Sequence, residues 1–512
     1  MIYGFSPFGY EGAIITIETD LRKGIPATDI VGFADGSIKE SRERVQCAIK
    51  NSGFEYPPER VLISLSPCDL RKEGVGFDLP IALSIIEASK KEEMEHSSNT
   101  QVLVMGELEL SGKIRCVKGI YSALQTAVAN GIKYAIIPKN AEKEPDGILC
   151  HRADTLEEAF YALQNLEEDI TDEAYNEMLS KQKSTGSKNK IEFEDFDFKD
   201  NFDNIENGLK FAMAVAIAGR HNMAVWGSPG CGKTMALQNL PLIMPKLLPE
   251  EEASTKRIWS LAGLLKPTEE IKNRPFRIPH QTASIEGICG GGPNCRPGEI
   301  SLAHNGVLFL DEAAEFRSSV LQMLRVPLET KNITLSRAGR STVYPANFQL
   351  FMTTNPCPCG NYGSKDKICL CSAKSIDLYW KKFSAPLFDR IEIRYDCNNP
   401  IETNFMTLEM VRDLISNAWE RQLKRQGKLN NELTPQEISD YVKLTSDAQY
   451  CLDEAIKKYG YSPRTISNIL KLSRTITDMF VDKETTEIEA VWLPEAIKLH
   501  PEVPAFGFND NY

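Results

Sequence analysis

The octapeptide GSPGCGKT, Gly227–Thr234, decides the fold because it fits the pattern G-x-x-x-x-G-K-[ST] in the setting that this pattern requires. The preceding residues NMAVWG read as a buried strand, and TMALQNLPLIM reads as the helix that follows. Backbone N–H groups of such a glycine loop can wrap a β-phosphate, while Lys233 reaches the β- and γ-oxygens and Thr234 offers its hydroxyl to Mg²⁺. The stretch predicts an α/β P-loop domain with ATP and Mg²⁺ as cofactors, the nucleotide being bound by Gly227, Ser228, Pro229, Gly230, Cys231, Gly232, Lys233 and Thr234.

Two later apolar runs supply the polar groups that such a loop needs. GVLFLDEA places Asp311 and Glu312 at the carboxyl end of a strand, where ligands of α/β proteins collect. We expect Asp311 to hold Mg²⁺ and Glu312 to act as the general base on the attacking water. The next strand, FQLFMTT, ends at Asn355, whose amide would lie near the γ-phosphate and orient water.

Arginines further along the chain are candidates for stabilising charge in a phosphoryl transition state. Arg390 precedes a strand in SAPLFDRIEIRY, and Arg464 follows Pro463 at the start of a predicted helix. An arginine finger can contribute about 10³–10⁵ in rate. We expect Arg390 and Arg464 to be catalytic, together with Glu312 and Asn355, and Arg325 is a weaker candidate.

Directly after Asn355, the loop NPCPCGNYGSKDKICLC contains four of the thirteen cysteines as two Cys-x-Cys pairs. Four thiolates from one short loop suit tetrahedral Zn²⁺, which closes its coordination shell and folds the loop. We therefore predict a zinc site formed by Cys357, Cys359, Cys369 and Cys371, with an unmetallated loop of reduced thiols as the alternative.

Length and composition narrow the classes of protein to consider. A chain of 512 residues is too long for one core, and its 42% hydrophobic and 25% charged residues are ordinary for a globular protein. We see no signal peptide and no membrane-spanning run, so a cytoplasmic protein with no membrane partner is expected. A net charge of −12 argues against wholesale coating of a polyanion but allows a local basic strip.

The pattern changes along the chain in four stages. Residues 1–165 read as alternating short strands and helices, and residues 166–203 as a charged linker. Residues 204–397 return to apolar strands between Gly- and Pro-rich loops, and this segment would contain the P-loop core with its Cys-rich insert. Residues 398–512 carry apolar residues at three- and four-residue spacing, which predicts a helical lid.

The run from RPFRIPHQTAS to MLRVPLE, with NPCPCG and LFDRIEI after it, resembles the magnesium-chelatase-like AAA+ ATPases of the YifB/ComM type. The resemblance covers nearly the whole chain, including DIVGFADGSIKES near the N-terminus. It implies a homo-oligomeric ring, often a hexamer, in which Arg390 reaches a neighbour's ATP and Arg464 acts within its own lid. This chain departs from the family at Gln281, where a second histidine is usual.

In this family the first domain resembles the C-terminal domain of Lon protease, which raises a protease hypothesis. Lon-type proteolysis needs a serine activated by a lysine. The segments that resemble those loops carry Asp78 at the serine position and Tyr121 at the lysine position, with Lys118 nearby but displaced. A carboxylate and a phenol do not form that dyad, so we expect a non-proteolytic scaffold or binding module.

LETKNITLSRAGRSTVYPANF reads as a hairpin carrying Lys331, Arg337 and Arg340, which are candidate contacts for a DNA backbone. A solvated hairpin explains these cations equally well. The leading hypothesis is a DNA motor with helicase-like or branch-migration activity in natural transformation or recombination. The alternatives are a chelatase-type ATPase and a chaperone-like ATPase, each remodelling a protein partner.

Overall fold

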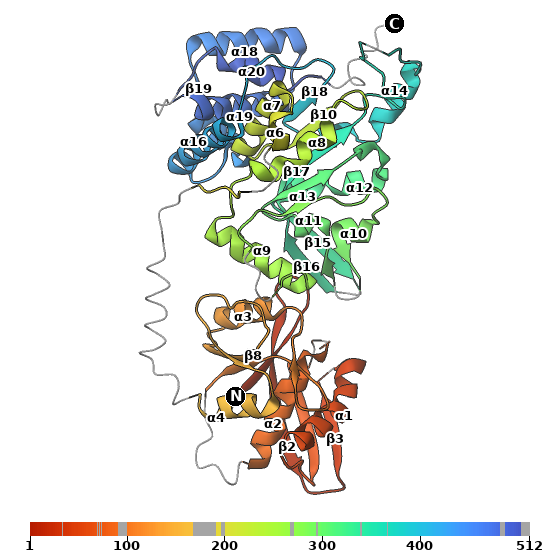
Figure 1. The fold of residues 1–512 in the computed structure, drawn as a ribbon, viewed down its shortest axis with the longest axis vertical. Helices are drawn as coiled ribbons and strands as arrows, with labels where there is room; N and C mark the ends of the chain where they lie inside the picture. Colours follow the sequence, from red (N-terminus) through yellow and green to blue (C-terminus); the bar gives the residue numbers. More distant parts are fainter. Residues whose placement is uncertain are drawn as a thin grey trace.

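The structure is a computed structural model of the 512-residue chain. It describes residues 1–32, 34–68, 70, 72, 74–90, 100–166, 191–195, 200–266, 271–292, 295–337, 340–365, 367–481 and 487–502. Two separate sheets organise these residues, and a group of helices follows the second sheet (Figure 1). The expected α/β class is confirmed. None of the helices in the described ranges combines the length and the apolar character that a membrane span requires.

The first sheet has seven strands in the order β3-β4-β2-β1-β5-β8-β9 and mixes parallel and antiparallel pairs. We call residues 2–164 the N-terminal module. Its elements are β1 (Ile2–Ser6), β2 (Ala13–Arg22), β3 (Ala27–Val31), α1 (Gly36–Asn51), β4 (Arg60–Ser66), η1 (Val75–Phe77), α2 (Asp78–Lys90), β5 (Val102–Val104), β6 (Glu107–Leu108), β7 (Ile114–Arg115), α3 (Ile120–Ala129), β8 (Tyr134–Pro138), β9 (Leu149–Ala153) and α4 (Leu156–Gln164).

Local sequence accounts for the main elements of this module. In β4 every second residue of RVLISLS is buried, which is the alternation of a strand with one face in the core. Helix α1 begins after Asp35, whose Oδ1 accepts the Ile38 N–H at 2.9 Å as an N-cap. Helix α2 is buried continuously from Asp78 to Ile86, so it fills the centre of the module.

The second sheet has five parallel strands in the order β11-β14-β17-β10-β18. The first of them in the chain, β10, lies between the last two, β17 and β18. All residues of β10, β14 and β17 are buried, as expected for parallel strands covered on both faces. The sheet strands are β10 (Met223–Trp226), β11 (Phe276–Arg277), β14 (Val307–Leu310), β17 (Gln349–Thr354) and β18 (Ile393–Asp396).

Helices and short strands complete what we call the P-loop module, residues 191–397. They are α6 (Asp200–Asp203), α7 (Asn207–Gly219), α8 (Lys233–Gln238), η2 (Leu240–Leu242), α9 (Pro249–Ala262), α10 (Ile285–Cys289), β12 (Gly290–Gly291), β13 (Arg296–Pro297), α11 (Glu299–Leu302), η3 (Ala313–Glu315), α12 (Ser318–Met323), α13 (Arg325–Thr330), β15 (Asn332–Arg337), β16 (Arg340–Pro345), α14 (Ala373–Lys381) and α15 (Ala385–Phe388).

Three sequence predictions can be checked directly in this module. The three strands predicted around the P-loop are present as β10, β14 and β17, and the predicted hairpin is present as β15 and β16. The helix predicted over TMALQNLPLIM is shorter than expected: α8 ends at Gln238 and a 3₁₀ turn follows. Pro241 explains the difference, because proline lacks the N–H that an α-helix would need there.

The lid consists of α16 (Leu408–Gln426), η4 (Asn430–Glu432), α17 (Pro435–Tyr441), β19 (Lys443–Leu444), α18 (Ser446–Tyr459), α19 (Pro463–Phe480), β20 (Glu487–Ile488) and α20 (Trp492–Lys498). Thr407, Thr445 and Ser462 cap α16, α18 and α19, and Pro463 occupies the first turn of α19 as predicted. Helices α16 and α19 both pack on α7 and share one apolar core with it, so the lid continues the core of the P-loop module.

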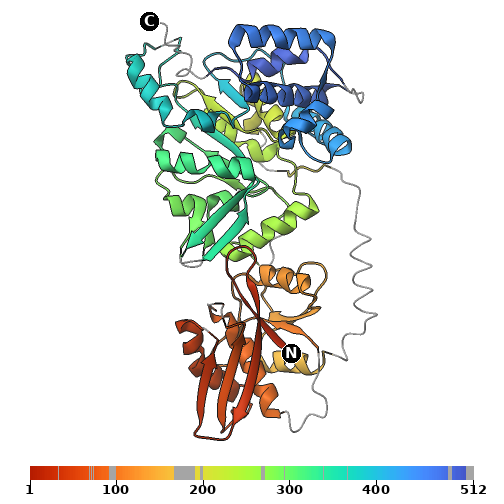
Figure 2. The same ribbon diagram turned by 180° about the vertical axis from the view of Figure 1, so that it is seen from behind.

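The two modules meet where the turn between β1 and β2 reaches the P-loop module (Figure 2). The Arg257 guanidinium on α9 donates to the carbonyls of Tyr10 and Glu11 at 2.9 Å each, and it lies 4.7 Å from the centre of the Tyr10 ring. Ser260 donates to the buried Glu142 carboxylate at 2.8 Å. The N-terminal module is therefore held by specific polar contacts as well as by the chain.

Much of the predicted linker, 167–190 and 196–199, lies outside the described residues. Its described part lies on the P-loop module: Phe193 pairs with Pro245, and Glu192 accepts the Lys246 N–H at 2.8 Å. Residues 191–195 thus associate with the P-loop module, although the sequence pattern assigned them to the linker.

Candidate active site

The loop Gly227–Gly232 connects β10 to α8 at the carboxyl end of the sheet. Gly230 and Gly232 have φ angles of 87° and 85°, a region that non-glycine residues rarely adopt, so both glycines are required for the turn. Gly232 is the N-cap of α8 and provides no side-chain hydrogen bond. Residue 232 therefore does not cap the first N–H groups of α8 with a side chain, which suits these groups to binding an anion.

A cavity of about 330 Å³ lies beside this loop and α8, and it is lined by Pro229, Gly230, Gly232, Lys233, Thr234, Met235, Glu312, Thr353, Thr354 and Asn355. Lys233 Nζ donates to the carbonyls of Gly227 and Ser228 at 2.6 and 3.1 Å and to Asn355 Oδ1 at 3.4 Å. The fold therefore brings together residues that are 122 positions apart in the sequence.

Behind the cavity, Asp311 accepts two hydroxyl hydrogen bonds on one oxygen. Thr234 Oγ1 donates to Asp311 Oδ1 at 2.8 Å, and Thr353 Oγ1 donates to the same oxygen at 2.6 Å. Thr353 also accepts the Glu312 N–H at 2.9 Å. No pattern in the sequence marks Thr353, because only the register of β14 against β17 brings its hydroxyl to the Asp311–Glu312 pair.

Glu312 is exposed and occupies the left-handed region with φ 50° and ψ 52°, which is uncommon for a residue with a side chain. Gln281 Nε2 donates to Glu312 Oε2 at 2.8 Å, which fixes the orientation of the carboxylate. The sequence marked Gln281 only as a departure from the resembling family. Its position beside Glu312 identifies it as a candidate positioning residue.

The candidate arginines lie elsewhere on the module, around Glu329. Arg390 bonds the Glu329 carboxylate and donates to the Pro386 carbonyl at 2.5 Å. The hydrogen bond from Arg390, and then the charges of Arg390, Arg464 and Arg325, lower the pKa of Glu329. Three arginines that the sequence singled out separately thus share one counter-ion.

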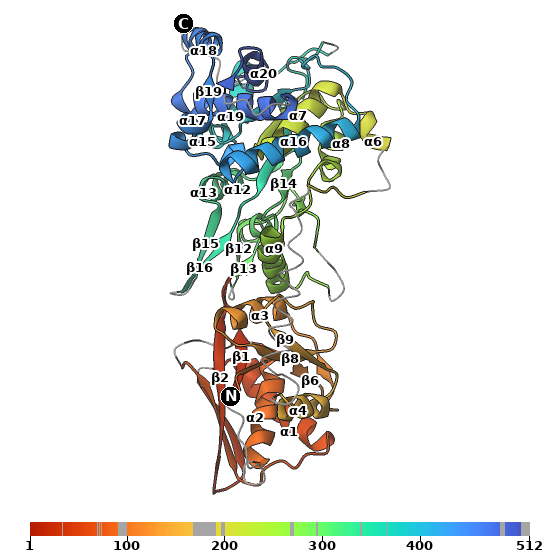
Figure 3. The same ribbon diagram turned by 90° about the vertical axis from the view of Figure 1, so that its left-hand side faces the viewer.

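This arginine cluster is at the opposite edge of the sheet from the P-loop. Strands β10 and β18 are parallel and in register, with Met223 opposite Ile393; the P-loop follows β10, whereas Arg390 precedes β18. Four residues of strand span about 13 Å, so about the length of a strand separates the backbone of Arg390 from the P-loop of the same chain. Figure 3 shows α13 and α15 on one side of the module and α8 on the other.

The position of Arg464 differs from the position that the family resemblance implies. Asn468, one turn after Arg464 in α19, donates to the Asp389 carbonyl at 3.4 Å, so this end of the lid packs beside the Arg390 segment. Arg464 therefore lies with Arg390, and it does not line the cavity beside its own P-loop. The sequence could not show this, because the packing of α19 against the sheet sets the direction of the helix.

The four cysteines of the loop after β17 converge. Sγ atoms of Cys357, Cys359, Cys369 and Cys371 all lie within 4.8 Å of one another. The closest pair, Cys357 and Cys359, is 3.4 Å apart, and Cys369 is 3.7 and 3.6 Å from these two. Cys357 is buried and the others are more exposed. Four thiols at these separations match the ligand set of a tetrahedral soft-metal site.

The cysteine loop touches the P-loop directly. Gly360 has a φ of 78°, and a Cβ on it would lie 2.6 Å from the Pro229 ring, so only glycine allows this close approach. Asn398 connects the two loops on the other side: its Oδ1 accepts Ser228 N–H at 3.2 Å, and its Nδ2 donates to the Tyr362 carbonyl at 3.1 Å. The cysteine loop and the P-loop are therefore in direct contact.

Of the three proposed DNA contacts, the structure describes the side chain of Lys331. Lys331 is the C-cap of α13 at the base of the hairpin, and burial lowers the pKa of its ammonium group. It is thus poorly placed for a DNA backbone. Arg337 and Arg340 pair at the outer end of the β15–β16 ladder, and their side chains lie outside the described part of the structure. The hairpin also contacts the N-terminal module, because Thr342 Oγ1 accepts the Tyr10 N–H at 3.2 Å.

The positions that would carry a Lon-type dyad hold structural groups instead. Asp78 is fully buried and accepts hydrogen bonds from Ser41 and from Arg44, whose Nε lies 3.0 Å away. Tyr121 is buried, which raises the pKa of its hydroxyl to about 12, and its backbone N–H donates to Glu142. Asp78 and Tyr121 thus stabilise the module and its interface.

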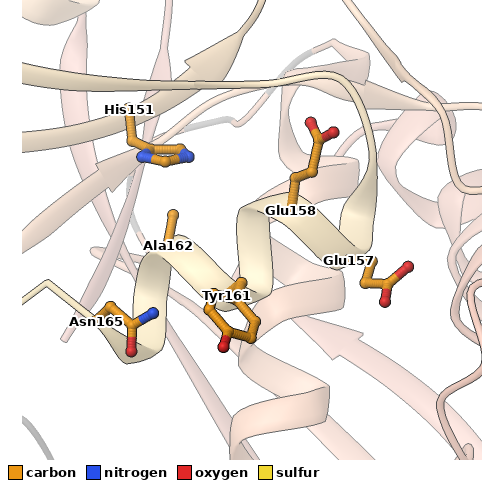
Figure 4. Close-up of a pocket in the computed structure, with 6 residues that line it drawn as sticks. All are labelled: His151, Glu157, Glu158, Tyr161, Ala162 and Asn165. Carbon is orange, nitrogen blue, oxygen red and sulfur yellow. The ribbon is translucent and has the colours of Figure 1, made fainter.

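A second cavity, of about 310 Å³, lies in the N-terminal module between β9 and α4 (Figure 4). His151 comes from β9 and the other lining residues come from α4 and its C-cap: Glu157, Glu158, Tyr161, Ala162 and Asn165. The Glu158 carboxylate accepts the Asp154 N–H at 2.7 Å, so it is hydrogen-bonded to the backbone just before α4 begins. None of the site residues predicted from the sequence lines this cavity.

Comparison with known families gives three matches along the chain, and all three descriptions name the ChlI subunit of magnesium chelatase. Residues 17–141 match the family described as "Subunit ChlI of Mg-chelatase", residues 201–404 match "Magnesium chelatase, subunit ChlI", and residues 406–500 match "Magnesium chelatase, subunit ChlI C-terminal". Together these matches span the N-terminal module, the P-loop module and the lid.

Individual relatives cover almost the full length. The chain is 34% identical over 488 residues to the Competence protein ComM of Haemophilus influenzae and 34% identical over 490 residues to the uncharacterized protein YifB of Escherichia coli. In both comparisons 94% of this chain and 93% of the relative are aligned. A Lon protease of Mesomycoplasma hyopneumoniae is 28% identical over 146 residues, which are 27% of this chain and 16% of that protein.

Proposed function

The chain belongs to the magnesium-chelatase ChlI-like family of AAA+ proteins, and from this premise we propose that it is a Mg²⁺-dependent ATPase that works as a ring motor on DNA. The observation that supports the ATPase best is the convergence of Lys233, Thr234, Glu312 and Asn355 on one cavity, with Asp311 behind it. These groups come from the ends of two strands, β14 and β17, and from helix α8, and this is the set of charges and hydroxyls that phosphoryl transfer requires.

The residues present fit ATP and Mg²⁺. The Lys233 ammonium is held by two carbonyls and an amide oxygen, which phosphate oxygens can replace. The paired oxygens of Thr234 and Asp311 suit a hard cation that prefers oxygen ligands. When bound there, Mg²⁺ would neutralise charge on the β- and γ-phosphates.

The side chains around the cavity then have separate roles. Lys233 and the N–H groups at the start of α8 bind the phosphates. Glu312, held by Gln281, accepts a proton from the attacking water, and Asn355 orients that water near the γ-phosphate. Thr353 hydrogen-bonds both the Asp311 carboxylate and the Glu312 backbone N–H. It therefore links Asp311, proposed to bind the metal, to Glu312, proposed to act on water.

The arginine cluster completes a site on a neighbouring copy. Arg390, Arg464 and Arg325 surround Glu329 at the edge opposite the P-loop, which supports action on a nucleotide bound by another subunit. We propose a homo-oligomeric ring, hexameric as in related AAA+ proteins, in which Arg390 and Arg464 face the ATP of the next subunit. Glu329 is their counter-ion in the isolated chain.

DNA is the proposed substrate of the motor. The similarity to a protein named for competence supports a role in DNA uptake or recombination, with branch migration or helicase-like movement as the activity. Arg337 and Arg340 at the outer end of the hairpin would contact the phosphate backbone without reading bases. Remodelling of a protein partner is the competing function, since the same hairpin also contacts the N-terminal module.

The test is ATP hydrolysis by the full chain with single-stranded, duplex and forked DNA, each compared with no DNA. We expect forked or single-stranded DNA to stimulate hydrolysis several-fold, and we expect Arg337→Ala/Arg340→Ala to remove the stimulation while leaving the basal rate intact. Basal hydrolysis that no DNA alters, with no binding of labelled DNA at low salt, would reject DNA and favour a protein substrate.

We also propose that the cysteine loop holds Zn²⁺. Four Sγ atoms within 4.8 Å of one another match a Cys₄ site. The loop begins directly after Asn355, and its Gly360 packs closely against Pro229 of the P-loop. Bound metal would fold the loop and so set the position of Asn355 and of the P-loop. The exposed side chains of Ile368 and Leu370 alternate with the last two cysteines, as expected when alternate residues point toward the metal and away from it.

A further inference from the structure

Cys231 in the P-loop and Cys397 after β18 lie beside each other, although 166 positions separate them in the sequence. A Cβ built on Gly227 would be 2.7 Å from Cys397 Cβ and 3.1 Å from Cys231 Sγ, so both atoms approach the same point. The Cys397 N–H donates to the Trp226 carbonyl at 2.8 Å, which holds Cys397 against the end of β10. The two thiols are hydrogen-bonded to each other.

We propose that Cys231 and Cys397 form a peroxide-oxidisable thiol pair whose disulfide switches off nucleotide binding. The inference rests on the proposed ATPase and adds a modification site to it. Both side chains lie against Gly227, so the two thiols are neighbours that a disulfide would join directly. Neither cysteine belongs to the proposed zinc site, and neither is assigned to the hydrolytic step.

The surroundings favour Cys231 as the thiol that reacts first. Cys231 is exposed, and Lys233 Nζ lies 3.7 Å from its sulfur. The hydrogen bond from Cys397 and the charge of Lys233 lower the pKa of Cys231 to about 6. The same hydrogen bond and burial raise the pKa of Cys397, which therefore remains a protonated donor. A thiolate at an accessible position next to a second thiol is the usual arrangement of a redox-sensitive pair.

The reaction balances with a hydroperoxide as the oxidant. The Cys231 thiolate attacks one peroxide oxygen and the O–O bond breaks, giving a sulfenic acid and, from hydrogen peroxide, hydroxide that takes up a proton. Cys397 then attacks the sulfenic sulfur, the S–O bond breaks, and water leaves with the thiol proton. Two thiols and one hydrogen peroxide give one disulfide and two waters, and the two sulfurs supply the two electrons.

The disulfide would stabilise the loop conformation seen here. In this conformation the carbonyls of Gly227 and Ser228 hold Lys233 Nζ, and those bonds compete with phosphate oxygens. A cross-link between Cys231 and Cys397, which follows β18, would restrict the P-loop to this conformation. A ligand that needs a different loop conformation then binds more weakly.

The test treats reduced, full-length protein with hydrogen peroxide. Non-reducing digestion and mass spectrometry measure the linked 231–397 peptide, and a fluorescent ATP analogue reports affinity. We expect the linked peptide to form together with a loss of affinity of at least about tenfold, which dithiothreitol reverses. Cys397→Ser and Cys397→Ala should bind nucleotide normally and keep their affinity after peroxide. Cys451→Ser, the matched control, should behave like the parent.

The outcomes separate the two proposals. Absence of the linked peptide after peroxide treatment that oxidises other thiols overturns the thiol pair, and so does equal loss of affinity in Cys397→Ser and the parent. Failure of the untreated parent to bind the ATP analogue rejects the ATPase instead, and the linked peptide still reports on the thiols.

Discussion

At the scale of single residues, the site depends on side chains whose backbone is constrained. Glu312 adopts a left-handed conformation, which is costly for a residue with a Cβ, and its N–H is fixed by Thr353. Its carboxylate is fixed separately by Gln281. These contacts hold both the backbone and the carboxylate of Glu312 in one orientation.

Lys233 and Glu312 should fail in different ways when replaced. Lys233→Ala should lower ATP affinity, because the lysine charge acts on bound phosphates. Glu312→Gln should bind ATP at near-parental affinity and hydrolyse it at least about a hundredfold more slowly, because the amide does not accept the proton of water. Equilibrium binding and single-turnover hydrolysis measure the two effects. Parental hydrolysis by Glu312→Gln would show that another group is the base.

Gln281 should affect turnover without affecting binding. Gln281→Ala should reduce kcat by about tenfold at unchanged KM, because the Glu312 carboxylate loses the donor that orients it. Gln281→His restores a donor and should recover most of the rate. It should also introduce a pH dependence near the ordinary histidine pKa, which a merely structural role does not produce. Steady-state kinetics across pH 6–8 make the comparison, and a rise in KM without loss of kcat would contradict the assignment.

At the scale of elements, loops from separate strands hold one another in position. The cysteine loop contacts the P-loop through Gly360 and Pro229 and through Asn398. The hairpin β15–β16 connects the P-loop module to the N-terminal module through Thr342. The N-terminal module is therefore in direct contact with the hairpin proposed to move DNA.

The cysteine loop gives a prediction about metal removal. Purified protein should contain about one zinc per chain, and Cys369→Ser/Cys371→Ser should lose it. ATP turnover should fall more than the unfolding temperature, because the loop is at the surface but touches Pro229 and follows Asn355. Elemental analysis, ATPase rate and thermal unfolding are compared with Cys47→Ser/Cys68→Ser, which changes two exposed thiols elsewhere. A zinc-free parent, or a variant with the parental ATPase rate, would count against the site.

At the scale of the whole molecule, the sheet separates the two halves of the proposed reaction centre. The phosphate-binding groups lie at the carboxyl edge, and the arginine cluster around Glu329 lies at the opposite edge. Each chain thus presents one half-site on each of two sides. Such an arrangement becomes complete in a closed ring of identical subunits.

Mixing inactive variants tests this arrangement. Lys233→Ala protein mixed with Arg390→Ala protein should recover part of the ATPase activity, because some interfaces pair an intact Lys233 site with an intact Arg390. Lys233→Ala mixed with Arg464→Ala should recover likewise if Arg464 also acts on the neighbour. The control mixes Lys233→Ala with Glu312→Gln, both defective in the same half-site, and should show no recovery. Co-assembled mixtures that remain inactive with Arg390→Ala would disprove action between subunits.

Buried histidines predict loss of stability in mild acid. Burial lowers the pKa of His221 and His500 to about 3 and of His304 to about 4. Between these folded-state pKa values and the unfolded value near 6.5, the unfolded chain binds more protons than the folded chain. The contribution of these histidines to the free energy of unfolding is therefore complete above pH 6.5 and decreases as the pH falls. The decrease approaches about 1.4 kcal/mol per pH unit for each histidine. Unfolding midpoints from pH 8 to 5 check this, and a smaller pH dependence is expected for His304→Gln.

Local patterns in the sequence were enough to predict the second sheet and the candidate residues of its loop. GSPGCGKT between an apolar strand and a helix, and two further apolar runs ending in Asp311–Glu312 and Asn355, identified the phosphate-binding edge. Apolar runs, glycine turns and helix caps act over a few residues, so they can be recognised without the fold. The four-cysteine cluster was recognisable for the same reason, since its members lie within fifteen residues.

Only the tertiary structure decided which distant residues meet. Gln281 and Thr353 both touch Glu312, Cys397 meets Cys231 where the loops after β18 and β10 adjoin, and burial of Lys331 lowers its pKa. The direction of α19 placed Arg464 beside Arg390, away from the cavity of its own chain. Such contacts depend on how preformed elements pack, and packing is set by the complementarity of whole surfaces, which no local pattern in the sequence records.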